Sequence, residues 1–351
     1  MTDTYVRENP IPAKALVLTV HDPIFIDGNA GFTNASGVVW GSGTALDPFI
    51  IAGWDIDAFI GGNLSNTYGI RIESTEAYFI VRNCWVYNGS SFYGIYLSNC
   101  VNGIVEDNSC WNDYSGIAIS SSNLITLRNN TCSNDFTGIT LISSSNNTLS
   151  NNDCGPSGQI CLLLAYSSGN TLVNNTCSYG YEGIRLDLSS NNTLIGNNCS
   201  SNYFGGIDFT SSSNNEISQN LVYDNTVYGA YIESGSNNHI WNNTFIDNNG
   251  ATSTYNGSHV QALDDGTNNW WNSTDGYGNY WSDWTTPDVT PPYGIVDLPY
   301  NVSGSAGAKD YYPLTIEPAG PIPEFGIVPL VAMVMLGAVL LTIVARRKKV
   351  Q

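Results

Sequence analysis

The chain has 351 residues, of which 30 are acidic and 11 basic, and its formal net charge is −19. Four of the basic residues lie at positions 346–349, which leaves seven for the rest of the chain. This balance excludes nucleic acid as a partner, because binding to phosphates depends on lysine and arginine. It disfavours polyanionic glycans for the same reason.

The N-terminal residues 1–20 contain one short apolar run, at positions 15–20, which is too short for a secretion signal. We interpret residues 1–20 as a remnant: either a signal has been removed or the chain begins late. Residues 21–40 are expected to form a cap, because the open end of a stack of strands must be covered. Residues 47–56 then have the pattern of a first turn, with Gly53 near its corner.

Between positions 68 and 248 the chain repeats one phrase of 22 to 25 residues eight times. Each copy has a strand-like run after a Gly-Ile-like pair and a second run before an asparagine. A period of this length is typical of a solenoid. The unit is too short for two helices and is rich in residues that disfavour helix interiors. We therefore predict an all-β fold, a parallel β-helix of nine to ten turns within residues 21–249.

One polar and one apolar position recur in every copy. Stacked asparagines can bond to one another through their side-chain amides, and cysteine can serve as a small apolar residue in a narrow interior. The predicted ladder consists of Asn83, Asn108, Asn130, Asn152, Asn175, Asn197, Asn220 and Asn243, and two residues after five of them come Cys110, Cys132, Cys154, Cys177 and Cys199. The spacing of one cysteine per turn favours buried free thiols, although eight cysteines outside the cell also permit disulfides. The C-x2-C spacing of a zinc site is absent, and we predict no metal ligands.

After position 249 the period ends and aromatic residues gather, among them Trp270, Trp271, Tyr280, Trp281 and Trp284. We expect residues 250–316 to form a C-terminal cap in which these rings close the core. The alternative is a platform on which sugar rings stack.

The C-terminal segment has the pattern of a membrane anchor. A proline-rich linker at 317–325 leads into 20 uncharged, largely apolar residues at 326–345, long enough for one transmembrane helix. The basic tail at 346–351 would lie in the cytoplasm, so the β-helix would face the outside of the cell. Sequons such as Asn34, Asn88 and Asn129 fit an exported glycoprotein, although a repeat rich in Asn, Ser and Thr also produces sequons by chance.

The turns resemble the NosD-type, CASH-like right-handed parallel β-helix repeats of archaeal surface proteins. The resemblance covers nearly all of residues 21–314 and rests on the phrases at 24–32, 278–283 and 310–314 and on the repeated Gly-Ile and Asn-Asn-Thr-Leu phrases. Residues 323–326 (Pro-Glu-Phe-Gly) resemble the archaeal PEF-type C-terminal sorting signal, which implies processing of the tail; a plain membrane anchor fits equally well. The first resemblance implies sugar binding or sugar processing at most. It also implies copper-site maturation as a distant third role, which the scarcity of exposed soft ligands disfavours.

Catalytic β-helices act through the outer face of one sheet, and alternation after each Gly-Ile pair predicts which residues point outward there. The ligand-binding candidates are Arg71, Glu73, Tyr96, Tyr231 and Glu233, and the catalytic candidates are Arg185, Asp187 and Asp208; Cys161 and Leu163 are predicted in the same two rows. Two carboxylates about 5 Å apart could act as a retaining glycosidase pair, and a further carboxylate could hold calcium. An arginine beside two aspartates is more often a solvated ion-pair patch. A lyase would lack the cations and the base that it needs.

A further row lies two residues before the glycines and contains Phe92, Tyr114, Phe136, Tyr181 and Phe204. Such rings either fill a corner of the core or line a groove for sugars. Together these observations predict a cell-surface protein with a structural or adhesive role, non-catalytic and without a cofactor, whose partners are glycans or envelope proteins. An extracellular carbohydrate-active enzyme, a glycoside hydrolase or an epimerase, is the alternative.

Overall fold

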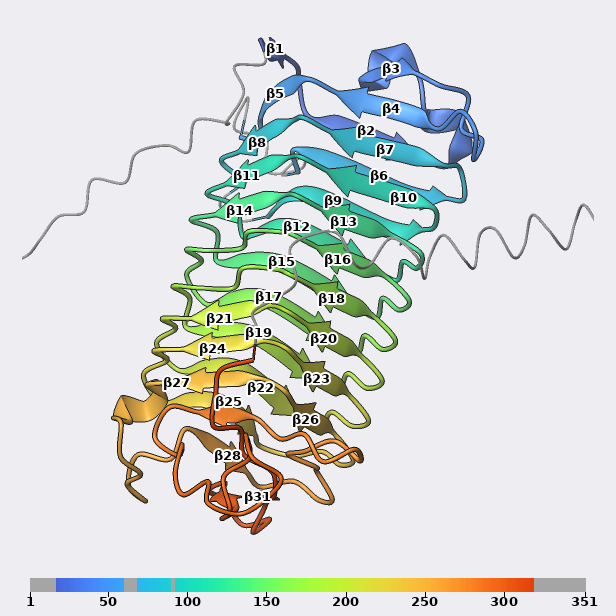
Figure 1. Cartoon of the computed structure of the whole chain (residues 1–351). Helices are drawn as coiled ribbons and strands as arrows, with labels where there is room; N and C mark the ends of the chain where they lie inside the picture. Colours follow the sequence, from blue (N-terminus) through green and yellow to red (C-terminus); the bar gives the residue numbers. More distant parts are fainter. Residues whose placement is uncertain (1–16, 60–67, 90–91, 319–351) are drawn as a thin grey trace, which may run out of the picture.

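The computed structural model describes residues 17–59, 68–89 and 92–318. These residues form a rod with the earliest strands at one end and residues 250–318 at the other (Figure 1). Within these ranges no helix is long and apolar enough to cross a membrane. The predicted transmembrane segment 326–345 and the basic tail lie outside the described residues.

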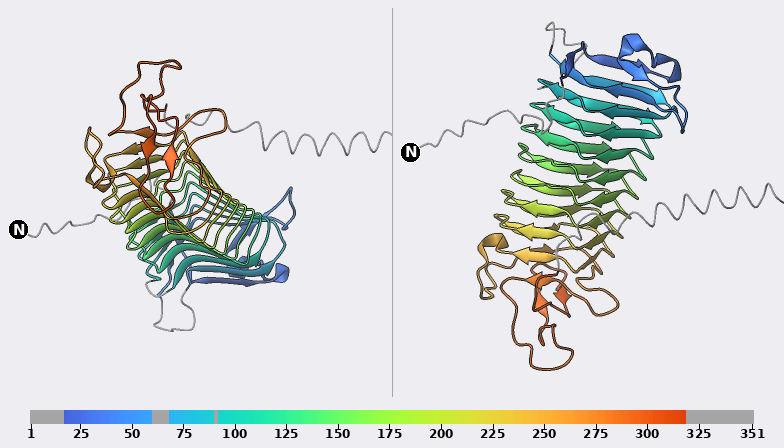
Figure 2. Two further views of the ribbon diagram at one scale, coloured as in Figure 1. Left: turned by 90° about the horizontal axis from the view of Figure 1, so that it is seen from below. Right: turned by 45° about the horizontal axis from the view of Figure 1, so that its top comes forward.

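The rod is built from three stacks of short strands, which Figure 2 shows from two further directions. The first stack, called here the β2–β28 sheet, has ten strands that all pair in parallel. In stacking order they are β2 (Ile24–Asp27), β6 (Ile70–Thr75), β9 (Tyr93–Cys100), β12 (Ser115–Ser120), β15 (Thr137–Ile142), β17 (Ile160–Ala165), β19 (Glu182–Asp187), β22 (Gly205–Thr210), β25 (Tyr228–Ile232) and β28 (Ala262–Asp264).

The second stack also has ten strands, and only its terminal pair, β3 with β4, is antiparallel. Its members are β3 (Val38–Trp40), β4 (Phe49–Ala52), β7 (Phe79–Arg82), β10 (Gly103–Glu106), β13 (Thr126–Arg128), β16 (Thr148–Ser150), β18 (Thr171–Val173), β20 (Thr193–Ile195), β23 (Glu216–Ser218) and β26 (His239–Trp241).

The third stack is interrupted in the middle, where single parallel bridges from Thr131 through Asp153 and Thr176 to Asn198 join its two parts. The first part contains β1 (Thr19–Val20), β5 (Trp54–Asp57), β8 (Trp85–Tyr87), β11 (Ser109–Trp111) and β14 (Thr131–Ser133), and the second β21 (Asn198–Ser200), β24 (Leu221–Tyr223), β27 (Thr244–Ile246) and β29 (Tyr280–Trp281). Three 3-10 turns, η1 (Asn29–Gly31), η2 (Asn34–Ser36) and η3 (Asn248–Gly250), and the antiparallel pair β30 (Tyr300–Asn301) and β31 (Lys309–Asp310) complete the described residues.

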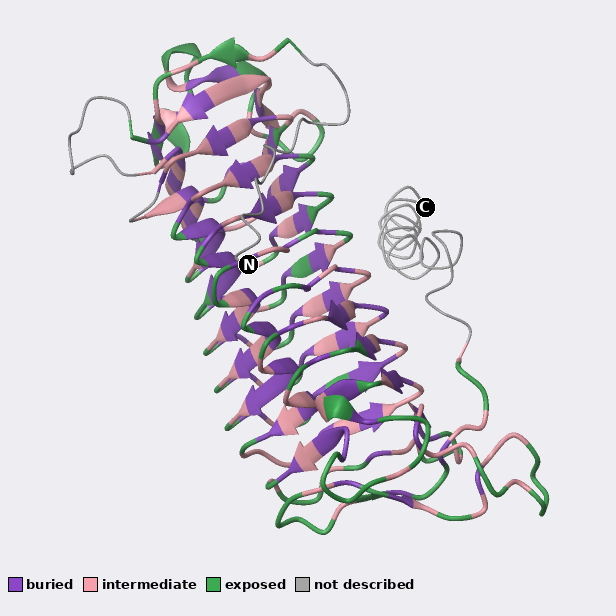
Figure 3. Cartoon of the chain, turned by 90° about the vertical axis from the view of Figure 1, so that its left-hand side faces the viewer, coloured by how far each residue is buried: buried purple, intermediate pink, exposed green. Residues whose placement is uncertain are grey.

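Each turn of the chain contributes to all three stacks before the next turn begins, which confirms the predicted all-β parallel β-helix. About eight regular turns are present. The prediction of nine to ten turns was made for residues 21–249. The β2–β28 sheet extends beyond the regular turns through β2 at one end and, outside that range, through β28 at the other. Buried positions follow the strands and exposed ones gather at the corners and in the C-terminal loops (Figure 3).

The interior is lined by aliphatic side chains and by thiols. Cys110 pairs in register with Cys132, and Cys199 pairs with Val222, which pairs with Phe245. All eight cysteines are free and buried. Burial raises the pKa of the Cys84 thiol to about 12, so this thiol stays protonated and unreactive at neutral pH.

Asn-Asn doublets form the corners, and the two members have different roles. Asn174 has a φ of 54°, the left-handed conformation that asparagine tolerates better than most residues. Asn175, the second member, is fully buried. Its Nδ2 donates to Asn197 Oδ1 at 2.9 Å, and its own Oδ1 accepts from Asn152 Nδ2 at 2.9 Å. The doublets therefore supply both the turn and the bond between turns.

Three amide ladders of this kind run along the rod. The first contains Asn108, Asn130, Asn152, Asn175, Asn197, Asn220, Asn243 and Asn279, the second Asn147, Asn170, Asn192, Asn215, Asn238 and Asn269, and the third Asn202, Asn225, Asn248 and Gln261. Every amide donates toward the C-terminal end of the rod. Carboxylates lie at the ends of the ladders: Asn269 Nδ2 donates to Asp264 Oδ1 and Gln261 Nε2 to Asp283 Oδ1. Asp310 Oδ2 accepts from the backbone N–H of Asn279 at 2.6 Å and from its Nδ2 at 3.4 Å.

The prediction that Asn83 belongs to the ladder is wrong. Its φ of 51° makes it the equivalent of the first member of a doublet. The ladder position is taken by Cys84, whose backbone N–H donates to Asn108 Oδ1 at 3.0 Å. The register is thus shifted by one residue in this turn, and Val86 rather than Trp85 pairs with Cys110.

The aromatic C-terminal segment closes the core with only some of its rings. Trp281 is fully buried and stacks on Phe245 at 4.4 Å and on Tyr300 at 4.0 Å, and Trp271 is buried beside it. Trp270 is half exposed, with 49% of its surface accessible. The cap interpretation therefore holds for the inner rings and not for Trp270.

Candidate functional site

The outer face of the β2–β28 sheet carries most of the predicted site residues. Arg71 pairs in register with Tyr96, and Arg185 pairs with Asp208, which pairs with Tyr231. Asp187 lies two residues after Arg185 on β19 and pairs with Thr210. The structure thus brings Arg185 and Asp208 together as neighbours and sets Asp187 apart from Asp208 along the strand direction.

Two residues predicted in the outward rows are placed differently. Cys161 is fully buried, because Leu162 rather than Ile160 pairs with Ile184. In the register of β17 with β19, Leu163 therefore pairs with Arg185 and Ala165 pairs with Asp187. The Gln159-Ile160 pair was mistaken for the Gly-Ile pair of the other turns, since this turn has cysteine where the others have glycine.

Glu182 is the functional residue that the sequence pattern missed. Both of its oxygens accept from Arg185 Nη1, at 3.2 and 3.3 Å, and its side chain is only 7% exposed. Glu182 pairs in register with Gly205, and Ile184 pairs with Ile207. The residues on both sides of Gly183 therefore have known positions in the sheet. The glycine breaks the strict two-residue alternation, and the residue before it returns to the outer face. That break is the signal that could have identified Glu182.

Asp208 is the most unusual side chain on this face. It is 4% exposed, and neither carboxyl oxygen has a hydrogen-bond partner within the described residues. The carboxyl lies over Gly205, where an added Cβ would come within 2.4 Å of Oδ1. Glycine at position 205 therefore provides the space into which this carboxyl folds.

The electrostatic surroundings favour a proton on Asp208. Its pKa is raised well above the usual range of a carboxyl, first by burial and then by the nearby Glu182, and Arg185 only partly opposes this. Burial also raises the pKa of Glu182, but there the Arg185 guanidinium acts against the shift at hydrogen-bond distance. Of the two carboxyls, Glu182 is hydrogen-bonded to the Arg185 guanidinium and Asp208 is not.

Aromatic rings lie beside Asp208 on the next turn, where Tyr231 pairs with it in register. Phe204 meets Tyr228 at 5.9 Å and Tyr231 at 5.8 Å, both edge to face, and Tyr228 stacks on Tyr231 at 5.2 Å. Tyr181 stacks on Phe204 at 5.5 Å. We call the group formed by Glu182, Arg185, Phe204, Asp208, Tyr228 and Tyr231 the Asp208 cluster. Glu233, another predicted residue, lies beyond it and accepts from Thr210 Oγ1 at 3.0 Å.

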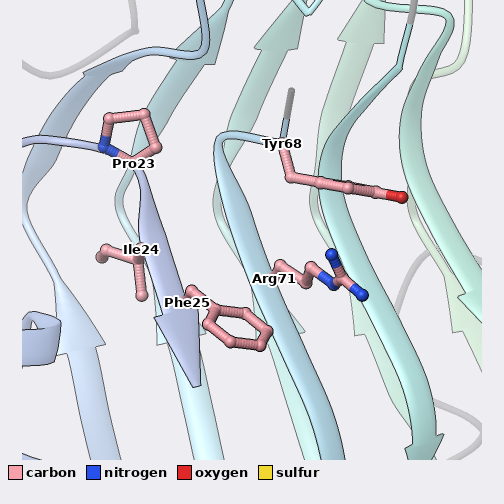
Figure 4. Close-up of a pocket in the computed structure, with 5 residues that line it drawn as sticks. All are labelled: Pro23, Ile24, Phe25, Tyr68 and Arg71. Carbon is pink, nitrogen blue, oxygen red and sulfur yellow. The ribbon is translucent and has the colours of Figure 1, made fainter. Parts of the chain in front are cut away.

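A second aromatic group lies near the N-terminal end of the same sheet. The Arg71 guanidinium lies 5.1 Å from the Phe25 ring and 4.8 Å from the Tyr68 ring, and it bonds to Glu73 at 2.9 Å. Pro23, Ile24, Phe25, Tyr68 and Arg71 line a small pocket of about 70 Å³ there (Figure 4). Tyr96 stacks on Tyr93 at 5.1 Å. We call the group formed by Phe25, Tyr68, Arg71, Glu73, Tyr93 and Tyr96 the Arg71 cluster.

The aromatic row before the glycines lies at the surface and does not fill a core corner. Tyr114 is 44% and Phe136 48% exposed, and their rings stack at 5.1 Å. Tyr181, which stacks on Phe204 of the Asp208 cluster, is 38% exposed. This finding corrects the core-filling interpretation and leaves the groove interpretation open.

The face as a whole offers acids and rings and few cations. Among residues 17–59, 68–89 and 92–318 no group of three histidine, cysteine or acidic side chains is arranged to hold a metal ion. Arg71 and Arg185 are each committed to a glutamate. The chemistry available is hydrogen bonding, ring stacking and proton exchange at Asp208 and Glu182.

The fold and this outer face define a parallel β-helix protein with an aromatic and acidic sheet surface. The family described as "Right handed beta helix region" matches residues 38–155, 68–202 and 115–265, and the chain belongs to this family. The winding is therefore right-handed, as expected. No curated protein matches the chain.

Several solved structures are similar in fold. The Dettilon tailspike protein is 16% identical with a TM-score of 0.51, and the match covers 66% of this chain and 52% of the tailspike. A double mutant of the periplasmic alginate epimerase AlgG is 14% identical with a TM-score of 0.46 and coverages of 62% and 64%. The A-module of the Azotobacter vinelandii mannuronan C-5 epimerase AlgE4 is 14% identical with a TM-score of 0.43 and coverages of 67% and 84%. The chain spans less than two thirds of the tailspike and of AlgG, and these likenesses concern the fold alone.

Proposed function

We propose that the protein binds a glycan along the outer face of the β2–β28 sheet. The observation that carries this proposal is the presence of two aromatic clusters on one face, each built around charged side chains. The flat faces of aromatic rings pack against the apolar faces of sugar rings, while polar groups beside them bond to hydroxyls. Six strand spacings separate Arg71 on β6 from Asp208 on β22, a span of about 29 Å. A glycan that reached both clusters would be several sugars long.

The charge of the face limits which glycans fit. Glu73, Glu182, Asp187, Asp208 and Glu233 lie on it. Among the described residues of this face, the arginines Arg71 and Arg185 are each paired with a glutamate. A polyuronate would bring further carboxylates into this field and would be repelled. The ligand class that we propose therefore excludes acidic glycans, whatever the substrates of the fold neighbours.

The cellular location of the protein is proposed from the features predicted from its sequence. We propose that the rod stands on the outer surface of a cell, held by the segment at 326–345, and presents this face to surface glycans or to envelope proteins. Its role would be structural or adhesive. A rigid rod suits that role because its bonded turns hold the two clusters at a fixed separation.

A binding experiment tests the proposal. Residues 17–318, fused to a purification tag, would be screened on a glycan array beside the variant Tyr96→Ala/Tyr231→Ala, which removes one ring from each cluster. We expect binding to uncharged glycans and a loss of about 10-fold to 100-fold in the variant, since stacking on one ring contributes about 0.5–1.5 kcal/mol beyond its buried area. Tyr223→Ala is the matched control, because Tyr223 is 41% exposed but lies on β24 in another stack. Equal loss in the control, or no glycan bound at all, would contradict the proposal.

A carbohydrate-active enzyme is the second candidate, and one specific observation favours it. Glu182 is an ion-paired carboxylate and Asp208 is a carboxyl whose surroundings favour the protonated form. Such a difference between two neighbouring carboxyls is the arrangement in which one group serves as acid and the other as base. Incubating any bound glycan with the protein and measuring new reducing ends would distinguish a glycoside hydrolase from a binding protein.

A further inference from the structure

We propose that the Asp208 cluster binds the ammonium group of an amino sugar, so that the glycan recognised by this face contains sugars with a free amine. This inference rests on the proposed function and specifies its ligand. It starts from a missing partner: a carboxyl that is 4% exposed and whose two oxygens have no hydrogen bond within the described residues. Buried polar groups normally have partners, and an unpartnered one on a functional face indicates a group that arrives with the ligand.

The charges around Asp208 identify that group as a cation. On the β19 side, Asp208 faces Glu182 and Arg185, and on the β25 side it faces Tyr228 and Tyr231. Arg185 bonds to both oxygens of Glu182, and these two charges compensate each other. The ionised form of Asp208 is then one negative charge in excess, in a place where an anionic ligand would be repelled.

The aromatic walls suit the same group. The rings of Phe204, Tyr228 and Tyr231 contact one another, and Tyr231 pairs in register with Asp208. Ring faces attract cations, most strongly where water is excluded. An ammonium has three donors and can bond to both carboxyl oxygens while its remaining side faces a ring. A neutral hydroxyl could satisfy one oxygen only and would bring no charge.

Without a cationic ligand, a proton can take the place of the cation. Burial and Glu182 raise the pKa of Asp208, with Arg185 opposing them, and this favours the protonated carboxyl. An arriving ammonium stabilises the ionised form, and the proton then leaves to solvent. Binding of an amino sugar is therefore coupled to the release of a proton, and it strengthens as the pH rises through the pKa of Asp208. Binding of a neutral sugar by the protonated acid would show the opposite dependence.

The experiment uses three oligosaccharides with one backbone that differ only in the group at carbon 2: β-1,4-linked oligomers of glucose, N-acetylglucosamine and glucosamine. Calorimetry in buffers of different ionisation enthalpy gives both affinity and protons released. For residues 17–318 we expect the glucosamine oligomer to bind at least about tenfold more tightly than the other two, with net proton release. In Asp208→Asn this preference should vanish while the three affinities become similar.

Asp224→Asn is the matched control, since Asp224 is exposed and directly follows β24 in another stack; it should keep the preference. Two results would overturn the inference and leave the proposed function standing: equal affinity for all three oligomers, or a glucosamine preference that persists in Asp208→Asn. Binding of none of the three oligomers would count against the inference and the proposed function together. Thermal unfolding of each variant checks that the fold is intact.

Discussion

The amide ladders and the Asp208 cluster both contain buried polar side chains, but their hydrogen bonding is opposite. In the ladders each asparagine is bonded on both sides: Asn175 receives from Asn152 and donates to Asn197. In the cluster, Asp208 is also buried, but neither of its carboxyl oxygens has a hydrogen-bond partner within the described residues. The same scaffold thus satisfies one polar group completely and leaves another without a partner. Where a group has all its partners its role is to hold the fold, and where it has none its role lies outside the fold.

Asp113 and Asp135 complicate this comparison, because they are interior carboxyls in a ladder-like corner. Asp113 Oδ1 accepts from Gly89 N–H at 2.6 Å and Asp135 Oδ1 from Asp113 N–H at 2.8 Å, as the asparagines do in the ladders. The second oxygen of each, where an amide would place its NH2 group, is buried and has no hydrogen-bond partner among the residues that the structure describes. Burial raises the pKa of both carboxyls well above the usual range, since their ionised forms are the costly ones.

The largest effect is expected from breaking a ladder at its centre. Asn175→Ala removes the acceptor of Asn152 Nδ2 and of the Asn152 backbone N–H, and it removes the amide that donates to Asn197 Oδ1 and to the Leu149 carbonyl. Asn197 Oδ1 keeps only its bond from the backbone N–H of residue 175. We expect the free energy of unfolding to fall by about 3–4 kcal/mol, because several buried groups lose partners at once. Urea unfolding measures it. Asn198→Ala is the control, since this neighbouring asparagine is only half-buried and its Oδ1 has no partner. A loss in Asn175→Ala no larger than the control's would show that the ladders do not hold the turns together.

The carboxylate at the end of the first ladder should make stability depend on pH. Burial raises the pKa of Asp310 to about 6 despite its bonds from Asn279 N–H and Trp281 Nε1. The folded state then holds the proton more tightly than the unfolded chain. The corresponding stability is present below the ordinary carboxyl pKa and is lost as the pH rises through 6. A shift of about two units corresponds to roughly 3 kcal/mol.

The measurement is the difference in unfolding free energy between the wild type and Asp310→Asn from pH 4 to pH 7. The other buried carboxyls contribute equally to both proteins, so the difference isolates Asp310. We expect the variant to gain on the wild type across this range. Parallel curves would mean that the hydrogen bonds to Asp310 keep it ionised throughout and that its pKa is not raised.

Asp135→Asn should stabilise the rod and so bring this corner into line with the ladders. In the equivalent corner Asn202 Nδ2 donates to the Cys177 carbonyl at 3.1 Å, and an amide at position 135 would have the same opportunity. The expected gain at pH 7 is about 1–3 kcal/mol, the cost of an unsatisfied buried group. It should shrink toward pH 4, where the carboxyl carries its own proton. Denaturant midpoints at the two pH values decide it; a destabilised variant would show that the interior carboxyls have partners of their own.

The fold could be predicted from the sequence because its signals repeat. A misplaced register in one turn, as at Asn83 or Cys161, leaves the other turns unaffected, and the period still indicates the parallel β-helix. The ladder partners follow from the same repetition. The ends of the ladders also leave a signal in the sequence, because the aspartates at those ends all lie after the repeat has ended: Asp264, Asp283 and Asp310.

The site could be predicted only in part because its defining properties do not repeat. The outward positions of Arg185 and Asp208 followed from strand alternation. The burial of Asp208 depends on Gly205, over which its carboxyl folds, and Tyr231 of the next turn pairs with it in register. The role of Glu182 depends on the break in alternation at Gly183. Such contacts between turns can be predicted only when the register between neighbouring strands is known. The sequence pattern left this register uncertain by one or two residues.

Asp208→Asn gives the smallest expected change in stability and the sharpest test of the comparison. If Asp208 were structural like Asn175, its replacement would destabilise the rod. If it awaits a ligand, the amide removes a carboxyl that can ionise only at a cost, and the free energy of unfolding at pH 7 should stay level or rise by about 1 kcal/mol. Because the folded-state pKa is raised, this advantage should grow with pH. Urea unfolding at pH 5 and pH 8, with Asp187→Asn as the exposed counterpart, measures it. A clear destabilisation at pH 8 would place Asp208 with the ladders, since a group without partners in the fold has nothing there to lose.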